Sequence, residues 1–241
     1  MLVMYHRIRN EEKSCSIRNF EKQVKFAKSI GAKLTFDDGL KEHYTVAFPI
    51  LKKYNMVGTF FILTNSLNEI PTVHKVWILL EKYEDELIKE LNITKKEISR
   101  TKSIYYKSEQ LPTKNLKYYL MLNPHITEKY FKRYFNEKNI IKNFYMSKEE
   151  IQEIYDAGME IGNHGHTHKI MTTLSEKEQE EEIKTSHEIL KKYNPIGFSY
   201  PHGQYNDITI KLLKKYNYKY AVSTKSDELF DLRRIDTNEF K

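Results

Sequence analysis

Residues 34–39, LTFDDG, join a short apolar strand to two adjacent carboxylates and a glycine turn. Two neighbouring acids repel each other, so Asp37 and Asp38 are useful together only if a cation binds there or if the two have different roles. The simpler alternative is a strand-to-helix turn in which an aspartate caps the helix and Gly39 adopts a positive φ. Both interpretations place the acids directly after a strand.

Strand and helix signals alternate on both sides of this stretch. Apolar runs predict strands at residues 3–6, 32–36, 57–63, 159–162, 197–200 and 219–223. Amphipathic segments between them predict helices at 18–30, 42–54, 147–158, 175–193 and 207–216. Repeated βα units with buried strands indicate a parallel sheet, either open or closed into a barrel. On such scaffolds the active site lies at the carboxyl ends of the strands, where Asp37, Asp38 and His164 fall.

The segment at about 66–145 differs from the rest of the chain in composition and pattern. It is charged and rich in tyrosine, and it contains no convincing buried strand. Residues 94–97 have the form of a helix capping box, and amphipathic stretches follow at 116–122 and 128–135. We therefore expect a single domain over residues 1–241, with a helical insertion at about 66–145. The insertion either covers the mouth of the site or mediates self-association, and the sequence favours neither.

Composition excludes several classes of protein. The single Cys15 rules out an intrachain disulfide framework and a cysteine-rich zinc site. The net charge is +7, but lysines and glutamates are interleaved throughout, so we expect a solvated surface and no nucleic-acid partner. No apolar stretch approaches the roughly 20 residues of a membrane span. The chain starts directly in a predicted strand, so we expect a cytoplasmic protein unless an export leader has been trimmed.

A histidine cluster follows the strand predicted at 159–162. His164 and His168 are four residues apart, and on a helical turn this spacing puts both imidazoles on one side, able to hold a single ion. Alone, the spacing is equally typical of a polar surface turn. His166 points elsewhere on this geometry. Together with a carboxylate, however, two histidines form the ligand set of a hydrolytic metal site.

The order of the motifs is more specific than any one of them. TFDDG, GNHGHTH and FSYPHGQY, followed by the strand at 220–223, resemble the polysaccharide deacetylases, which are carbohydrate esterases of family four and contain the NodB-homology domain. The resemblance covers residues 1–64 and 146–236. It implies a distorted (β/α) barrel that binds one divalent metal ion, usually Zn²⁺, with Co²⁺, Ni²⁺ and Fe²⁺ as alternatives.

The resemblance also assigns roles to the acids and histidines already singled out. Asp37 matches the catalytic base of the family. Asp38 matches the metal-binding acid, and His164 and His168 match the two metal-binding histidines. The two adjacent carboxylates would therefore have different tasks.

The remaining expected site residues come from the third motif and from the start of the chain. Pro201-His202 is similar to the Pro-Tyr of the family, so the backbone N–H of His202 is expected to stabilise the oxyanion. We expect Tyr200, Pro201 and Tyr205 to contact the substrate. The first strand and its His6 resemble the circularly permuted members, which implies that His6 is the general acid.

Three departures from the family pattern stand out. Gly165 occupies a position that usually holds Ser or Thr, which removes a hydroxyl that helps to shape the loop. Ser199 replaces an arginine that orients the base, and Arg233 and Arg234 are the candidates to replace it from another strand. No Leu-x-x-His motif follows near the C-terminus.

The function implied is a metal-dependent hydrolase that removes an acetyl group from an N-acetylated amino sugar. The substrate would be a polysaccharide, an oligosaccharide or a surface-glycan precursor. Two alternatives stay open: an O-acetyl carbohydrate esterase, because ester and amide acetyls present the same carbonyl, and a non-catalytic glycan-binding relative. The oligomeric state is left open as well.

Overall fold

The computed structural model of the protein describes residues 1–9, 15–93, 111–225 and 227–237. The chain divides into two compact units. One unit contains Met1–Asn68 and Ile141–Lys241, and the other contains Glu69–Ile140. The second unit lies within the segment predicted to be a helical insertion.

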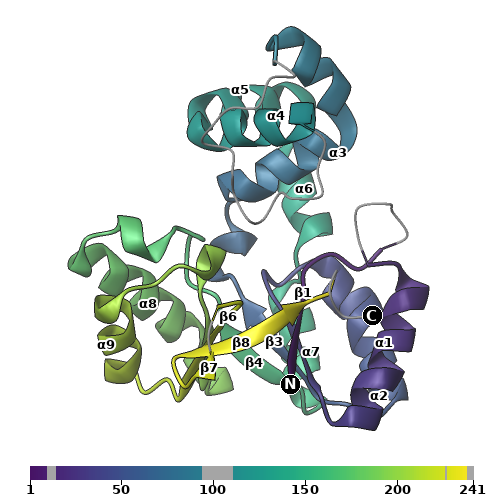
Figure 1. The fold of residues 1–241 in the computed structure, drawn as a ribbon, viewed down its shortest axis with the longest axis vertical. Coiled ribbons are helices and arrows are strands. Elements are labelled where there is room, and N and C mark those ends of the chain that lie inside the picture. The colour runs from purple at the N-terminus through teal and green to yellow at the C-terminus, as the bar shows by residue number, and fades with distance from the viewer. Residues whose placement is uncertain (10–14, 94–110, 226, 238–241) are drawn as a thin grey trace. The chain divides into compact units, whose positions relative to one another are not determined.

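The first unit is built around a parallel barrel, which confirms the predicted fold class. Its parallel strands, in chain order, are β1 (Leu2–Tyr5), β2 (Lys33–Phe36), β3 (Gly58–Ile62), β4 (Glu160–Asn163), β5 (Gly197–Ser199), β6 (Tyr220–Ser223) and β8 (Asp231–Asp236). Neighbours in this order pair with one another, and β8 also pairs with β1, which closes the barrel. Figure 1 shows the C-terminal strand β8 reaching β1. The short β7 (Asp227–Glu228) pairs antiparallel with β8.

Helices join successive strands of the barrel (Figure 1). They are α1 (Ile17–Ile30), the π-helical turn η1 (His43–Ala47) with α2 (Phe48–Lys53), α7 (Lys148–Asp156), α8 (Glu176–Leu190) and α9 (Asp207–Lys215). Short 3₁₀ turns also occur: η2 (Thr64–Leu67), η5 (Met171–Thr173), η6 (Lys191–Tyr193) and η7 (Pro201–Gly203). The helix starts predicted at Ser147 and Ser175 are confirmed, because both residues form complete capping boxes.

The second unit is helical in its described residues, as expected. Its helices are α3 (Thr72–Glu90), α4 (Leu111–Leu122), α5 (Pro124–Tyr134) and the first half of α6 (Glu137–Phe144). The capping box predicted at 94–97 lies outside the described residues. Among the helices that the structure describes, none combines the length and the apolar character needed to cross a membrane.

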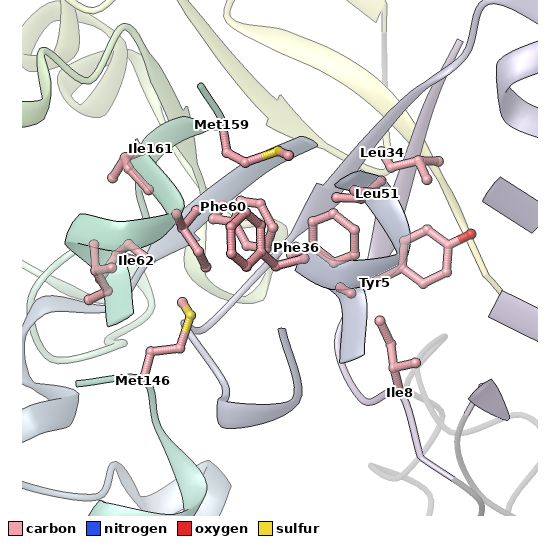
Figure 2. Close-up of a cluster of buried hydrophobic side chains, with 14 of the residues drawn as sticks. Tyr5, Ile8, Leu34, Phe36, Leu51, Phe60, Ile62, Met146, Met159 and Ile161 are labelled. Atoms are coloured by element: carbon pink, nitrogen blue, oxygen red, sulfur yellow. The ribbon is translucent and has the colours of Figure 1, made fainter. Parts of the chain in front are cut away.

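Stacked aromatic rings support the ends of the first strands (Figure 2). Tyr5, Phe36 and Phe60 come from β1, β2 and β3 and are fully buried. Adjacent rings in this row are stacked, with centroids 5.4 Å apart for Tyr5–Phe36 and 4.7 Å apart for Phe36–Phe60. Such pairs contribute about 0.5–1.5 kcal/mol each beyond the area they bury. His6 directly follows Tyr5, and Asp37 directly follows Phe36. The stacked rings therefore hold the backbone from which both residues project.

The helical spacing of the apolar residues in 18–30 predicts Phe26 and Ile30 on the buried face of α1, but their side chains are 46% and 45% exposed. The buried stripe of that helix consists of Phe20, Val24 and Ala27, whose spacing of four and three residues leaves Phe26 on another face. The strand β8 was not predicted by its own pattern.

Candidate metal centre and catalytic residues

Three ligand-type side chains from distant parts of the chain converge at the carboxyl ends of β2 and β4. Asp38 Oδ1 lies 3.3 Å from His164 Nε2 and 3.2 Å from His168 Nε2. One ligand atom of each residue lies within 4.8 Å of the other two. The three side chains are at most 7% exposed. A carboxylate oxygen and two imidazole nitrogens around one point form a donor set that fits a divalent cation.

The backbone after β2 separates the two adjacent acids. Asp38 and Gly39 both adopt left-handed conformations, with φ of 77° and 68°. This conformation is uncommon for a residue with a side chain, although aspartate tolerates it better than most. As a result Asp37 contacts Arg234, whereas Asp38 faces the two histidines. The two carboxylates therefore have different surroundings, as the sequence suggested.

The loop that carries the histidines is not a helical turn, contrary to the prediction. The backbone from His164 to His168 is irregular, and Gly165 and His168 have φ of 80° and 61°. These left-handed residues curl the loop and bring the two ligand rings to a centroid distance of 5.0 Å. His166 lies outside the cluster, with its Nδ1 2.9 Å from Thr64 Oγ1.

A hydrogen bond to one ring nitrogen fixes the orientation of the His164 ring. Its Nδ1 lies 2.8 Å from the carbonyl oxygen of Ser199. Because a carbonyl oxygen only accepts hydrogen bonds, Nδ1 carries a proton, and Nε2, which faces Asp38, is the nitrogen that could bind a cation. Burial alone would lower the pKa of His164, but the carboxylates of Asp37 and Asp38 outweigh it and raise the pKa. Because Asp37 is paired with Arg234, Asp38 is the carboxylate placed to attract a cation.

Asp37 forms a buried, two-pronged ion pair with Arg234 of β8. The guanidinium donates to both carboxylate oxygens, at 2.6 Å to Oδ1 and 2.7 Å to Oδ2. Both side chains are at most 3% exposed. Ser199 completes the arrangement, because its hydroxyl donates to Asp37 Oδ2 at 3.0 Å and accepts from Arg234 at 2.9 Å. Of the two candidate arginines, Arg234 supplies the guanidinium that position 199 lacks, whereas Arg233 is exposed.

The ion pair controls the protonation of Asp37. Burial raises the pKa of Asp37, but Arg234, with help from His164 and His6, outweighs burial and lowers it to about 2. An unfolded aspartate has a pKa of about 3.9. Asp37 therefore adds stability that is fully present above about pH 4 and is lost as the pH falls through about 2.

Replacing Arg234 by Met should lower the free energy of unfolding at pH 7 by about 3–5 kcal/mol, because it leaves a buried carboxylate without its counter-ion. Urea denaturation measures this difference. The same change at Arg233, the exposed neighbour on β8, is the matched control and should stay within about 0.5 kcal/mol of wild type. The deficit of the Arg234 variant should shrink between pH 7 and pH 3 as Asp37 takes up a proton. A deficit that does not change with pH would mean that Asp37 is not its source.

His6 follows the last residue of β1 and is half-buried. Its backbone carbonyl accepts a hydrogen bond from Nε2 of the buried His43 at 2.7 Å. His6 is close enough to Asp37 to contribute to the lowered pKa of that carboxyl. The structure thus places the predicted acid and the predicted base on the same rim.

The residues of the third motif, FSYPHGQY, differ in where they lie: His202 is beside the histidine cluster, whereas Tyr200 and Pro201 are buried. The His202 ring lies edge-on to that of His168, with centroids 4.7 Å apart, and its backbone has a φ of 57°. Tyr200 is 2% exposed and donates its hydroxyl to the carbonyl oxygen of Phe230 at 2.8 Å. Pro201 is also buried.

The placement of Tyr205 completes this motif. Its ring stacks on that of Tyr200 at 4.4 Å, and its hydroxyl donates to Asp231 at 2.6 Å. Tyr200 and Tyr205 thus pack against each other and donate their hydroxyls to Phe230 and Asp231. Substrate contact by Tyr200, Pro201 and Tyr205 stays a prediction.

One residue beside the site was not singled out from the sequence. Glu182 of α8 is 8% exposed and accepts hydrogen bonds from the backbone of His166 and Thr167. A signal for it exists, because Glu182 shares a helical face with Gln179 and Ser186, both fully buried. A glutamate on a buried stripe needs a hydrogen-bonding partner.

Comparison with known proteins agrees with the fold and with the motifs. The family described as polysaccharide deacetylase matches residues 27–102 and 117–221 of the chain. A peptidoglycan deacetylase of Helicobacter pylori is 32% identical over 101 residues. The match covers 38% of this chain and 33% of the relative, so it spans about a third of that protein's length.

Two solved structures share the architecture over nearly the whole chain. The Streptococcus pyogenes deacetylase PplD, in complex with acetate, has a TM-score of 0.60 and 20% identity, covering 98% of this chain and 90% of that chain. IcaB from Ammonifex degensii has a TM-score of 0.60 and 16% identity, covering 97% and 90%. At these identities the likeness shows the fold alone.

Proposed function

This chain belongs to the polysaccharide deacetylase family, and from that premise we propose that it is a metal-dependent hydrolase that removes the acetyl group from an N-acetylated amino sugar. One observation carries the proposal: Asp38, His164 and His168 converge while the adjacent Asp37 is held ionised by Arg234. A cation site with a separate carboxylate beside it suits hydrolysis, because one group can bind the ion while the other accepts a proton.

The donor set favours a zinc-like cation held by Asp38, His164 and His168. Two imidazoles and one carboxylate are typical ligands of Zn²⁺ in hydrolases, whereas Mg²⁺ and Ca²⁺ prefer oxygen ligands. Co²⁺, Ni²⁺ and Fe²⁺ also bind imidazole and are alternatives. When bound, such a cation lowers the pKa of a neighbouring water molecule and polarises the acetyl carbonyl of the substrate.

Asp37 is proposed as the general base. The water oxygen attacks the acetyl carbon while the water proton passes to the Asp37 carboxylate. Arg234 and Ser199 hold both carboxylate oxygens in place, so the base enters the reaction already oriented. A carboxylate with a pKa of about 2 is a weak base, which suits a water molecule that is already acidified.

The departing amine needs a proton, and His6 is proposed to donate it. Amide nitrogen is a very poor leaving group unless it is protonated as the C–N bond breaks. His6 lies on the same rim as Asp37, and its backbone is fixed by His43. The backbone N–H of His202 is proposed to stabilise the oxyanion. The products are acetate and a free amino group on the sugar.

The substrate is proposed to be a polysaccharide, an oligosaccharide or a surface-glycan precursor. The Helicobacter pylori relative is named a peptidoglycan deacetylase, which supports an acetylated glycan as the substrate class.

Acetate release from a panel of acetylated carbohydrates tests the proposal. We expect N-acetylated sugars or oligosaccharides to release acetate, a chelator to abolish the release, and added Zn²⁺ to restore it. The panel should include sugar nucleotides and O-acetylated sugars. Release from the O-acetylated members alone would favour the esterase alternative. Zinc binding without any acetate release would favour a non-catalytic glycan-binding relative.

A further inference from the structure

The loop between the two histidine ligands has an unusual backbone that must be held from outside. Gly165 and His168 are both left-handed, and no regular hydrogen-bond ladder joins the residues of this segment. A short irregular loop fixes two ligands at a set distance only if its backbone groups have partners elsewhere. Groups from other parts of the chain must therefore bind the backbone between His164 and His168.

Side chains satisfy the three backbone N–H groups between the ligands. The N–H of Gly165 donates to Asn163 Oδ1 at 2.7 Å. The N–H groups of His166 and Thr167 both donate to Glu182 Oε2, at 3.1 Å and 2.8 Å. The Thr167 hydroxyl donates to Glu182 Oε1. One carboxylate thus accepts three hydrogen bonds from two consecutive residues of the loop.

The opposite side of the loop is held by η2. The carbonyl oxygen of Gly165 accepts from the N–H of Thr64 at 3.2 Å, and that of His166 accepts from the N–H of Asn65 at 3.0 Å. The loop is therefore clamped between η2 and Glu182 of α8. Both sets of hydrogen bonds, from η2 and from Glu182, form this clamp.

Helix α8 is a rigid support for Glu182. Its N-terminus has a full capping box at Ser175, and Ile183 and Ser186, next to Glu182 on the same face, are fully buried. Ser186 also accepts a hydrogen bond from Asn163 Nδ2 at 2.9 Å, which fixes the residue just before the first ligand. The helix thus reaches both the start and the middle of the loop.

The position of Gly165 fits this arrangement. A Cβ atom at residue 165 would lie 3.8 Å from Glu182 Oε2, so the carboxylate reaches the place where a side chain from the loop would begin. Gly165 itself has no side chain that could donate to this carboxylate. The backbone N–H groups of His166 and Thr167 donate to it instead.

We propose that Glu182 is a positioning residue that sets the separation of His164 and His168 and thereby the affinity of the site for a divalent cation. The inference rests on the proposed function insofar as these histidines hold a cation. In this role Glu182 acts through the loop backbone that carries the two histidines, and not through their rings. Groups that orient metal ligands typically contribute a factor of about 10–100 to metal affinity.

Zinc affinity of Glu182 variants tests this proposal. Glu182→Ala should weaken binding of Zn²⁺ about 10–100-fold in competition with a chromogenic chelator, and should alter the visible absorption of the Co²⁺ form. Glu182→Gln should recover most of the affinity. Its amide oxygen can still accept from both backbone N–H groups, and its NH₂ can donate to the Thr167 hydroxyl.

Two controls on α8 separate positioning from general destabilisation. Glu181→Ala removes the same group from the exposed neighbouring position and should leave zinc affinity unchanged. Ile183→Val removes one buried methyl group and should lower the melting temperature of the metal-free protein without weakening zinc binding. If Glu182→Ala does not fold, Glu182→Met, which keeps the length of the side chain but cannot accept these hydrogen bonds, takes its place. A loss of zinc affinity of about 10–100-fold in that variant supports the proposal, and wild-type affinity overturns it.

Wild-type zinc affinity in a folded Glu182→Ala variant would overturn the inference. Because acetate release is not part of this measurement, weakened zinc binding in Glu182→Ala supports the clamp even if the wild-type protein releases no acetate, which would overturn only the proposed reaction. A wild-type protein that binds no divalent cation would overturn both.

Discussion

Asp37→Asn should lower turnover by about 10²–10⁴ while the metal content stays at the wild-type level. The amide cannot accept the proton of the attacking water, whereas Asp38, His164 and His168 are unchanged. Turnover of an N-acetylated substrate and metal analysis of the same preparation measure the two effects separately. The variant also leaves Arg234 facing a neutral group, so its stability should be recorded.

A conservative comparison isolates the chemical effect of Asp37→Asn. Ser199→Ala removes one hydrogen bond from the same carboxylate but leaves its charge and its pairing with Arg234. We expect a much smaller loss of turnover in Ser199→Ala. Loss of metal in Asp37→Asn would contradict the division of roles between the two acids.

The second large effect is expected from the histidines. His164→Ala or His168→Ala should remove both bound metal and activity, because each deletes one of three protein ligands. Metal analysis after dialysis, with zinc-dependent thermal shift as a second readout, measures the loss. Undiminished metal content in His164→Ala would show that the ligand assignment is wrong.

The same loop offers a matched control. His166 lies between the two ligands but contacts Thr64 and is not part of the cluster. His166→Ala should therefore retain metal and most activity. Equal losses in the His166 and His164 variants would mean that the loop responds to any substitution, and the ligand roles would then need independent proof.

Most of the barrel could be predicted from the sequence because buried parallel strands give continuous apolar runs. The run at 57–63 became β3, with Gly58–Ile62 buried throughout. The helix starts predicted at residues 147 and 175 coincide with the serine N-caps of α7 and α8. These features are local, so each could be recognised without knowing the rest of the fold.

The strand β8 could not be predicted in the same way. DLRRID places two arginines between two aspartates and contains no apolar run. Arg234 is buried because Asp37, far away in the sequence, neutralises it. This pairing is a tertiary contact, and the local sequence around Arg234 does not predict it.

The histidine loop shows the limit of reasoning from spacing. The spacing identified His164 and His168 correctly as neighbours in space, but the helical turn assumed for them was wrong. The actual backbone depends on contacts from Thr64 and Glu182, which lie elsewhere in the chain. Glu182 itself stands in an acidic run whose other members are mostly exposed.

The strand β8 has two roles, one in the architecture of the barrel and one in the surroundings of Asp37. The pairing of β8 with β1 and β6 completes the ring of strands, and the same six residues place the guanidinium of Arg234 against Asp37. A chain without residues 231–236 would consequently lack both the strand that closes the barrel and the positive charge that pairs with Asp37. Loss of this one segment would therefore remove both at once.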